Sequence, residues 1–255
     1  MNIYVAGALW VLGVAAVTAV LTILVRRFSK GDENAAEGIG GVFTIVAGVQ
    51  AVLMAFVLIS LFDTVGSARS GSFTEANALV GVYWAGDSLP EPARTQIQEL
   101  TRSYTNTVIE QEWPSMREGE PVATAGWDQL ERIRVTIDSA PTENDWQSDR
   151  KTEAASQLWT VYEARQSRLG AAGESGVSAV LWITLLVGSL LTIALPYLFY
   201  VPKLHVHIVM IAVLTGTITL LLFSIYQLQN PFGGGAPVDP DAFTAASGQM
   251  HGLAT

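Results

Sequence analysis

The 255-residue sequence contains no cysteine and is poor in basic residues, with 14 Lys and Arg against 23 Asp and Glu. Without cysteine, no disulfide framework, thiolate metal site or cysteine nucleophile is available. A formal net charge of −9 argues against nucleic acid as a partner, because phosphate binding needs a basic surface. The sequence also lacks a glycine-rich loop with a lysine, a nucleophile elbow and a dinucleotide fingerprint. We therefore expect neither an enzyme nor a cofactor.

Long apolar runs are abundant instead: half of the residues are hydrophobic, and four runs contain no Asp, Glu, Lys or Arg. At a rise of about 1.5 Å per residue, each run is long enough to cross a hydrocarbon core of about 30 Å as a helix. Basic residues follow the first run and do not precede it, so we expect a retained span and not a cleaved signal peptide. The four predicted spans lie at about residues 5–25, 40–62, 177–200 and 206–228.

The predicted fold is all-α, with four transmembrane helices in two hairpins and an extramembrane helical bundle inserted between the second and third spans. The bundle is predicted because apolar residues recur at helical spacing and no period-2 run of β-branched residues occurs. Within it, we expect one helix to start at Thr74, after a loop at 65–72, and another to end at Pro114. The predicted domains are a hairpin at 1–62, a soluble helical insert at 63–175, a hairpin at 176–229 and a flexible C-terminal tail at 230–255.

The orientation in the membrane is predicted from the basic residues of the short loops, because only short loops respond strongly to the positive-inside bias. Arg26, Arg27 and Lys30 lie in the first loop and Lys203 in the second, whereas residues 1–4 and the tail contain no Lys or Arg. We therefore expect a multi-pass protein of the cell membrane. Both short loops are predicted to be cytoplasmic, and the insert and both termini extracytoplasmic.

The second predicted span has one face of small side chains. At 100° per residue, Thr44, Gly48, Ala51 and Ala55 fall within about 60° of one another, and such a stripe lets a neighbouring helix approach closely. Gln50 points roughly 120° away from that stripe. An amide at mid-membrane needs a partner or water, so Gln50 is predicted either to form an interhelical hydrogen bond or to line a pore. These five residues are the candidate pore or helix-contact site.

Other polar residues in the sequence suggest little chemistry. Glu110 and Glu112 are two apart and do not share a helix face, so a helix-end role is favoured over paired acid and base work. His205 and His207 have no third ligand in view, so interfacial anchoring is favoured over a metal site. Three acidic residues share one predicted helix face: Asp145, Asp149 and Glu153. A straight acidic stripe lacks the turned loop that gathers calcium ligands, so a solvated face is favoured.

Four segments of the sequence resemble the prokaryotic bestrophin-like family. They are EANAL at Glu75–Leu79, SYTNTVIEQEWPSM at Ser103–Met116, YEARQSRL at Tyr162–Leu169 and LQNPFGG at Leu228–Gly234. The resemblance covers nearly the whole chain and implies the same order of hairpin, insert and hairpin. By distant analogy it implies an anion channel, although a shared fold does not establish a site. It supplies no catalytic motif.

Two functional hypotheses follow. Proton-coupled transporters, pumps and voltage sensors generally need acidic or basic groups within the membrane, whereas passive conduction does not. The first hypothesis is therefore a passive channel, with the second span lining the pore. Four helices scarcely enclose a water path, so this channel requires a homo-oligomer in the lipid bilayer. The alternative is a non-catalytic structural or accessory membrane protein whose helical domain docks another membrane or envelope complex.

Overall fold

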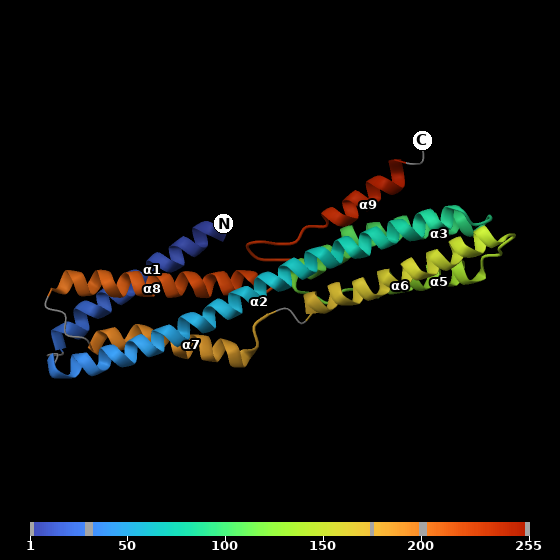
Figure 1. The fold of residues 1–255 in the computed structure, drawn as a ribbon. Coiled ribbons are helices and arrows are strands. Elements are labelled where there is room, and N and C mark those ends of the chain that lie inside the picture. Colours follow the sequence, from blue (N-terminus) through green and yellow to red (C-terminus); the bar gives the residue numbers. More distant parts are fainter. Residues whose placement is uncertain (1–2, 29–32, 174–175, 199–202, 253–255) are drawn as a thin grey trace. The chain divides into compact units, whose positions relative to one another are not determined.

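Helices make up the regular structure of the computed structural model, which describes residues 3–28, 33–173, 176–198 and 203–252. No β-strand occurs among these residues, which confirms the predicted all-α class. The elements follow in chain order (Figure 1): α1 (Ile3–Phe28), α2 (Glu33–Asp87), α3 (Ala93–Thr107), the π-helix η1 (Val108–Glu112), α4 (Trp113–Glu118), α5 (Ala125–Ser139), α6 (Asp145–Gly173), α7 (Ala179–Ala194), the 3₁₀-helix η2 (Leu195–Leu198), α8 (Leu204–Leu228) and α9 (Asp241–Gly252).

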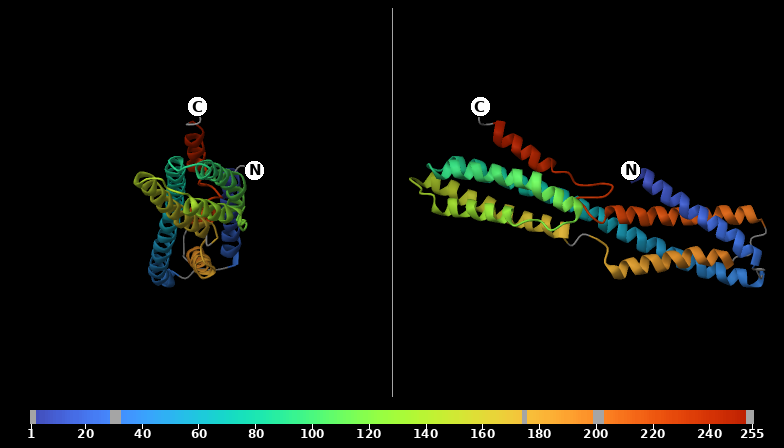
Figure 2. Two further views of the ribbon diagram at one scale, coloured as in Figure 1. Left: turned by 90° about the vertical axis from the view of Figure 1, so that its right-hand side faces the viewer. Right: turned by 180° about the vertical axis from the view of Figure 1, so that it is seen from behind.

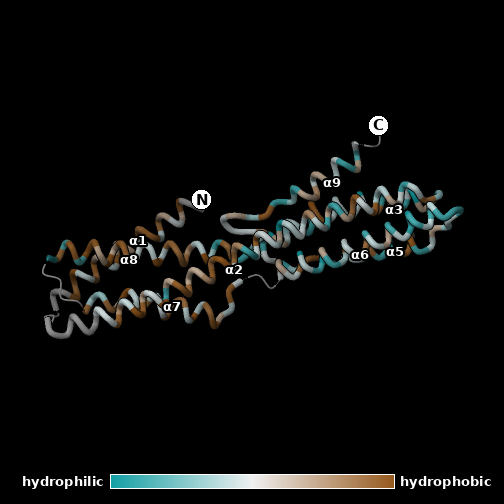
Figure 3. The backbone as a smooth tube through the Cα atoms, viewed as in Figure 1, coloured by the Kyte–Doolittle hydropathy of each residue, from teal (hydrophilic) through white to brown (hydrophobic). Residues whose placement is uncertain are grey.

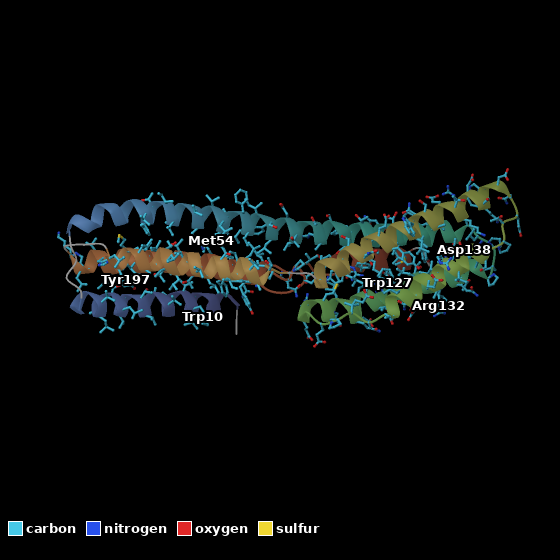
Figure 4. The ribbon with its side chains drawn as sticks, turned by 90° about the horizontal axis from the view of Figure 1, so that it is seen from below. Trp10, Met54, Trp127, Arg132, Asp138 and Tyr197 are labelled. Carbon is cyan, nitrogen blue, oxygen red and sulfur yellow. The ribbon has the colours of Figure 1, made fainter. Side chains whose placement is uncertain are left out.

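Four helical stretches are long and apolar enough to cross a membrane, as predicted. Figure 3 shows hydrophobic residues predominating in α1, α7 and α8, whereas hydrophilic residues are frequent in α5 and α6. The stretches are Val5–Val25, Gly40–Asp87, Ala179–Leu198 and Leu204–Leu228. Many large side chains on these stretches are exposed, for example Trp10, labelled in Figure 4, at 68%. Such surfaces suit lipid or protein contact in a bilayer, where water is absent.

Contacts within the chain group its residues into two units. We call Met1–Phe62 with Gly176–Gln229 the apolar unit, and Asp63–Ser175 with Asn230–Thr255 the acidic unit. Helix α2 contributes residues to both.

In the apolar unit, α8 packs against α1 and α7. Helices α1 and α8 approach closely at Gly7, where a Cβ would lie 2.6 Å from the Phe223 ring. The short helix η2 is held by two hydrogen bonds. The Tyr197 hydroxyl donates to the Thr18 carbonyl at 3.0 Å, and a ring nitrogen of His207 lies 3.0 Å from the Pro196 carbonyl.

Helix α2 is continuous where the sequence predicted a loop at 65–72 and a new helix at Thr74, so that prediction is wrong. Glycine costs only about 1 kcal/mol in a helix, and this stretch contains no proline to break it. Its hydroxyl side chains bond back to carbonyls of the same helix: Ser72 to Ala68 at 2.7 Å and Thr74 to Ser70 at 3.1 Å. Such bonds satisfy the hydroxyls without any loop.

The acidic unit is a helical bundle around one apolar core. Helix α3 packs against α5 and α9, and α5 packs against α6. The right-hand view of Figure 2 shows α3, α5 and α6 lying along one another. The core contains residues that are 2% exposed or less, including Leu79, Leu89, Ile97, Tyr104, Trp113, Leu130, Ile133 and Leu158.

The predicted helix end at Pro114 is also wrong, because α3 leads through the π-helix η1 into α4. Proline is disfavoured inside a regular α-helix, because its ring clashes with the preceding turn and it has no N–H. Here Pro114 lies in the first turn of α4, where the N–H has no α-helical partner to lose. Helix α4 ends instead at Gly119, which adopts the left-handed conformation with φ 73°.

Residues 241–252 form a packed helix within the stretch that the sequence predicted to be a flexible tail. Residues Asp241–Gly252 form α9, which buries Phe243 and Met250 in the core of the acidic unit. The indole N–H of Trp113 donates to the Val238 carbonyl at 3.0 Å. Phe243 and Met250 are the only large apolar side chains of this short helix, so residue patterns alone do not predict their burial.

Candidate functional site

Gln50, in the second span, is buried between α2 and α7. Its side-chain amide donates to the Leu185 carbonyl at 3.0 Å and to the Ser189 hydroxyl at 3.1 Å. A Cβ at Gly188 would overlap the Gln50 amide, so glycine leaves the space that this amide occupies. Of the two predicted roles for Gln50, the geometry within one chain is that of an interhelical hydrogen bond.

The small face of α2 lies elsewhere. Thr44, Gly48, Ala51 and Ala55 are all exposed, and nothing from the same chain lies within 4 Å of a Cβ placed at Gly48. The Thr44 hydroxyl bonds to the Gly40 carbonyl of its own helix at 3.0 Å. Among the described residues, no helix therefore covers the small face at Gly48. The structure separates the five predicted site residues into one buried amide and four exposed small residues.

The buried side of this span is built from larger residues at helical spacing. Met54, labelled in Figure 4, is 2% exposed, and Val57 and Leu61 are also buried. Together with Gln50 they form a stripe at intervals of three or four residues, which is the pattern of a helix packed along one side. The small face lies roughly 120° around the helix from this buried stripe. The contacts that bury the stripe therefore do not cover the small face.

The remaining candidates lie apart from this span. His205 is exposed, whereas His207 is 5% exposed, so the predicted interfacial anchoring does not hold for His207. No group of three or more potential metal ligands occurs among the described residues. The predicted acidic stripe on α6 is solvent-accessible, and Glu153 pairs with Arg150 at 2.5 Å.

The most highly charged interior region is in the acidic unit. It consists of Glu75 on α2, Tyr104 on α3, Glu112 on η1, and Arg165 and Arg168 on α6, and we call these five residues the charge cluster. All five are at most 2% exposed. The predicted helix-end role for Glu112 is therefore wrong.

Arg168 joins both carboxylates of the charge cluster. Its Nε donates to Glu75 Oε2 at 2.7 Å and its Nη2 to Glu75 Oε1 at 2.9 Å, a bidentate pair. The same Nη2 donates to Glu112 Oε2 at 2.9 Å. Arg165 pairs with Glu112, with Nη1 to Oε2 at 2.8 Å and Nη2 to Oε1 at 2.7 Å. Two positive and two negative groups thus neutralise one another inside the core.

Aromatic side chains enclose this neutral set. The Tyr104 hydroxyl donates to Glu75 Oε1 at 2.5 Å and accepts from Arg165 at 3.1 Å. The Arg165 guanidinium lies 4.7 Å from the Trp127 ring, labelled in Figure 4. The Arg168 guanidinium lies 5.5 Å from the rings of both Trp113 and Phe243. Cation–π contacts of this kind are stronger when water is excluded.

The pKa shifts of Tyr104 and Arg168 follow from this arrangement. Burial and the Glu75 carboxylate raise the pKa of the Tyr104 phenol well above its ordinary value. Burial on its own would lower the pKa of Arg168, but the carboxylates of Glu75 and Glu112 more than offset it and raise that pKa. Tyr104 therefore stays neutral and Arg168 stays charged near neutral pH. The ion pairs of the charge cluster join residues of α2, η1 and α6.

Hydrophobic periodicity and motif searches do not identify the charge cluster, but the family resemblance marks the segments that contain it. Three of the four segments that resemble the bestrophin-like family supply all of its members. The fourth segment supplies Phe232, whose ring packs edge-on against Trp113 at 5.3 Å. The segments are far apart in the sequence and come together only in the folded acidic unit.

The fold and the spans define a multi-pass, all-α membrane protein. A model of the Bestrophin-like domain matches residues 12–243. The chain belongs to the bestrophin-like family. None of the curated proteins compared with the chain matches it.

Two solved structures are similar to the chain over nearly its whole length. One is the crystal structure of a mutant membrane protein, with a TM-score of 0.70, 11% identity, and coverage of 95% of this chain and 98% of that chain. The other is the crystal structure of a mutant bacterial bestrophin homologue from Klebsiella pneumoniae, with a TM-score of 0.69, 14% identity, and coverage of 99% and 100%. At such low identity the likeness shows a common fold.

Proposed function

We propose that the chain is a subunit of a homo-oligomeric passive ion channel in the cell membrane, with α2 lining the conduction path. The observation that carries this proposal is the exposed small face at Thr44, Gly48, Ala51 and Ala55, with no described residue within 4 Å of a Cβ at Gly48. Small residues allow close contact between helices where lipid offers no hydrophobic drive. Membership of the bestrophin-like family supports a channel, and by analogy with bestrophins its ion would be a small anion.

A homo-oligomer is tested by substituting two glycines that are open in the single chain. Gly48→Leu places an isobutyl group on the proposed contact, whereas Gly13→Leu places the same group on α1, where nothing lies within 4 Å of a Cβ. We expect wild type and Gly13→Leu to form one defined oligomer by light scattering in detergent and to conduct in planar bilayers. Gly48→Leu should lose assembly, because overpacking typically costs about 1–3 kcal/mol. A wild-type monomer that carries no current would overturn the proposal.

The proposed topology has two membrane hairpins, α1 with the first part of α2 and α7 with α8. Their short connections would be cytoplasmic, and the acidic unit and both termini extracytoplasmic. Support comes from the basic residues of the short loops, of which Lys30 lies outside the described residues. Single cysteines replacing Ser148 and His205, both exposed, test it. In intact cells an impermeant maleimide should label position 148 and spare position 205, and the reverse pattern would invert the topology.

An accessory protein remains the second candidate, because two tryptophans of the acidic unit are largely exposed. Trp146 is 59% exposed and Trp159 is 65% exposed. Exposed tryptophan is common at protein interfaces. If the chain is an accessory protein, replacing both by serine should abolish co-purification with a membrane partner. If it is a channel, the same replacement should leave assembly and current unchanged.

A further inference from the structure

Helices α3 and α5 of the acidic unit line a groove of about 600 Å³. The α3 wall includes Glu99, Leu100 and Ser103, and the α5 wall includes Glu131, Arg132 and Val135. Sites for small molecules typically have volumes of about 300–1,000 Å³ and a few polar groups on an apolar lining. The groove is therefore large enough for a small molecule, and its lining is of mixed polarity.

Each wall of the groove carries one charge that is not neutralised. Glu99 on α3 and Arg132 on α5, labelled in Figure 4, form no ion pair with any described residue, including each other. Glu131 differs, because its two carboxylate oxygens accept from Arg134 at 2.9 and 2.6 Å. The groove thus has a free negative group on one wall and a free positive group on the other.

Both charged groups have a possible partner on their own helix and do not use it. Asp128 precedes Arg132 by four residues, a spacing at which opposite charges attract across one helical turn, yet the two do not pair. Arg102 follows Glu99 by three residues, but its guanidinium donates to the Tyr83 hydroxyl at 2.7 Å. Local pairing therefore leaves both charges available to a ligand in the groove.

The groove also offers a hydrogen-bond donor and an apolar surface. The Ser103 hydroxyl accepts from the Gln129 amide at 2.9 Å, and the same amide donates to the Thr107 hydroxyl at 3.0 Å, which ties α5 to α3. The Ser103 hydroxyl donates to no described residue, so its proton is free for a ligand. Leu100 is 9% exposed and Val135 is 51% exposed, and both line the groove.

We propose that this groove binds a small zwitterion with the chemistry of a free amino acid that has an apolar side chain. Arg132 donates to the ligand carboxylate, for which the planar guanidinium is suited, and Glu99 accepts from the ligand ammonium. The apolar part of the ligand lies on Leu100 and Val135. A ligand with one charge is disfavoured, because it would cover the opposite charge of the groove without giving it a partner.

This inference goes beyond the proposed channel function. All the residues that carry it belong to the acidic unit, and none of them lies in a candidate membrane span. The site therefore does not depend on whether the chain conducts ions.

The test is calorimetric titration of the full-length protein in detergent with L-leucine and two analogues. Leucinamide lacks the carboxylate, and 4-methylpentanoate lacks the ammonium. At about pH 6.5 the amine of leucinamide is protonated, so each analogue carries one charge. We expect L-leucine to bind with a Kd of about 1 mM or below and each analogue to bind about tenfold more weakly or worse.

Two single variants separate the roles of the two charges. Arg132→Gln and Glu99→Gln should each weaken leucine binding about tenfold or more, because each removes one charged partner. Arg132→Gln should bind leucinamide at least as well as wild type, and Glu99→Gln should do the same for 4-methylpentanoate. Arg69→Gln and Glu110→Gln are the matched controls, because they remove the same charges at exposed positions outside the groove and should leave leucine binding unchanged. Circular dichroism checks that all four variants fold.

The outcomes are decisive for the site. Absence of leucine binding to folded wild type, by calorimetry and by saturation-transfer NMR, would overturn the inference. Equal affinity for leucine and one analogue would overturn it as well, because the groove would then recognise a single charge. An equal loss in groove and control variants would also contradict it. Each of these results leaves the channel proposal standing, and a protein that binds leucine but carries no current would overturn only the channel.

Discussion

The apolar unit buries hydroxyls, the Gln50 amide and the His207 ring, whereas the acidic unit buries two carboxylates and two guanidinium groups. In the apolar unit, some buried hydroxyls find partners one turn away on their own helix, as in Thr22 to Thr18 at 2.7 Å and Thr192 to Gly188 at 2.8 Å. Buried hydroxyls of the acidic unit do the same, as in Ser72 to Ala68. Its buried carboxylates, in contrast, pair with guanidinium groups 53 to 93 residues away in the sequence.

The difference reflects what each kind of group requires. A hydroxyl is satisfied by one carbonyl that every helix offers, so it fits into a span without a second helix. A buried charge needs an opposite charge and several hydrogen bonds, because its desolvation costs several kcal/mol. A buried charged group therefore needs a partner from a distant part of the chain. We expect the stability of the acidic unit to depend strongly on its few buried charged residues, and that of the apolar unit to depend less on any single polar residue.

The largest expected effect comes from breaking the charge cluster. Arg168→Met keeps the apolar stem but leaves Glu75 and Glu112 short of a cation, so we expect a loss of about 3–5 kcal/mol of stability. Arg134→Met is the control, because Arg134 pairs with Glu131 and Asp138 on an exposed helix face, and exposed pairs contribute about 1 kcal/mol or less. Urea unfolding in detergent, followed by tryptophan fluorescence, measures both. Equal losses would show that burial of the charge cluster does not matter.

A smaller effect is expected for the phenol that bridges the charge cluster. Tyr104→Phe removes the donor to Glu75 and the acceptor for Arg165, which should cost about 1–3 kcal/mol at pH 8.

The effect of Tyr104→Phe should also depend on pH. Because the pKa of Tyr104 is raised in the folded state, the fold keeps this proton at a pH where the unfolded chain releases it. The stability that Tyr104 contributes is thus fully present below about pH 10 and declines as pH rises above it. The difference between wild type and Tyr104→Phe should shrink from pH 8 to pH 11 in urea unfolding. A constant difference would mean that the phenol does not hold its proton.

The smallest expected effect is in the apolar unit. Gln50→Leu removes the amide that bonds to Leu185 and Ser189, and such bonds in membranes average about 0.6 kcal/mol, with a maximum near 2. Val49→Leu is the control, because Val49 is 66% exposed. In thermal unfolding in detergent, Gln50→Leu should be slightly less stable than Val49→Leu. The bilayer conductance of both variants should equal that of the wild type. A large fall in conductance with unchanged stability would instead place Gln50 on the conduction path.

Several errors in the sequence-based prediction have one physical origin. Glycine and serine at 65–72 indicated a loop, Pro114 indicated a helix end, and the polar C-terminal residues indicated flexibility. The glycine and proline effects are local tendencies of about 1–3 kcal/mol, and packing in the acidic unit outweighs them. Glu112 was misjudged for the same reason, because a glutamate near a proline gives no local indication of a distant arginine.

The sequence by itself determined the all-α class, the four candidate membrane spans and the family. Span length and apolarity are properties of consecutive residues measured against a bilayer of about 30 Å, so they need no tertiary information. Only the tertiary structure decided that Gln50 faces α7 while the small face of α2 stays open, and that Glu75, Glu112, Arg165 and Arg168 meet in one core. Which face of a helix is covered, and which charges neutralise each other, depend on contacts between residues far apart in the chain.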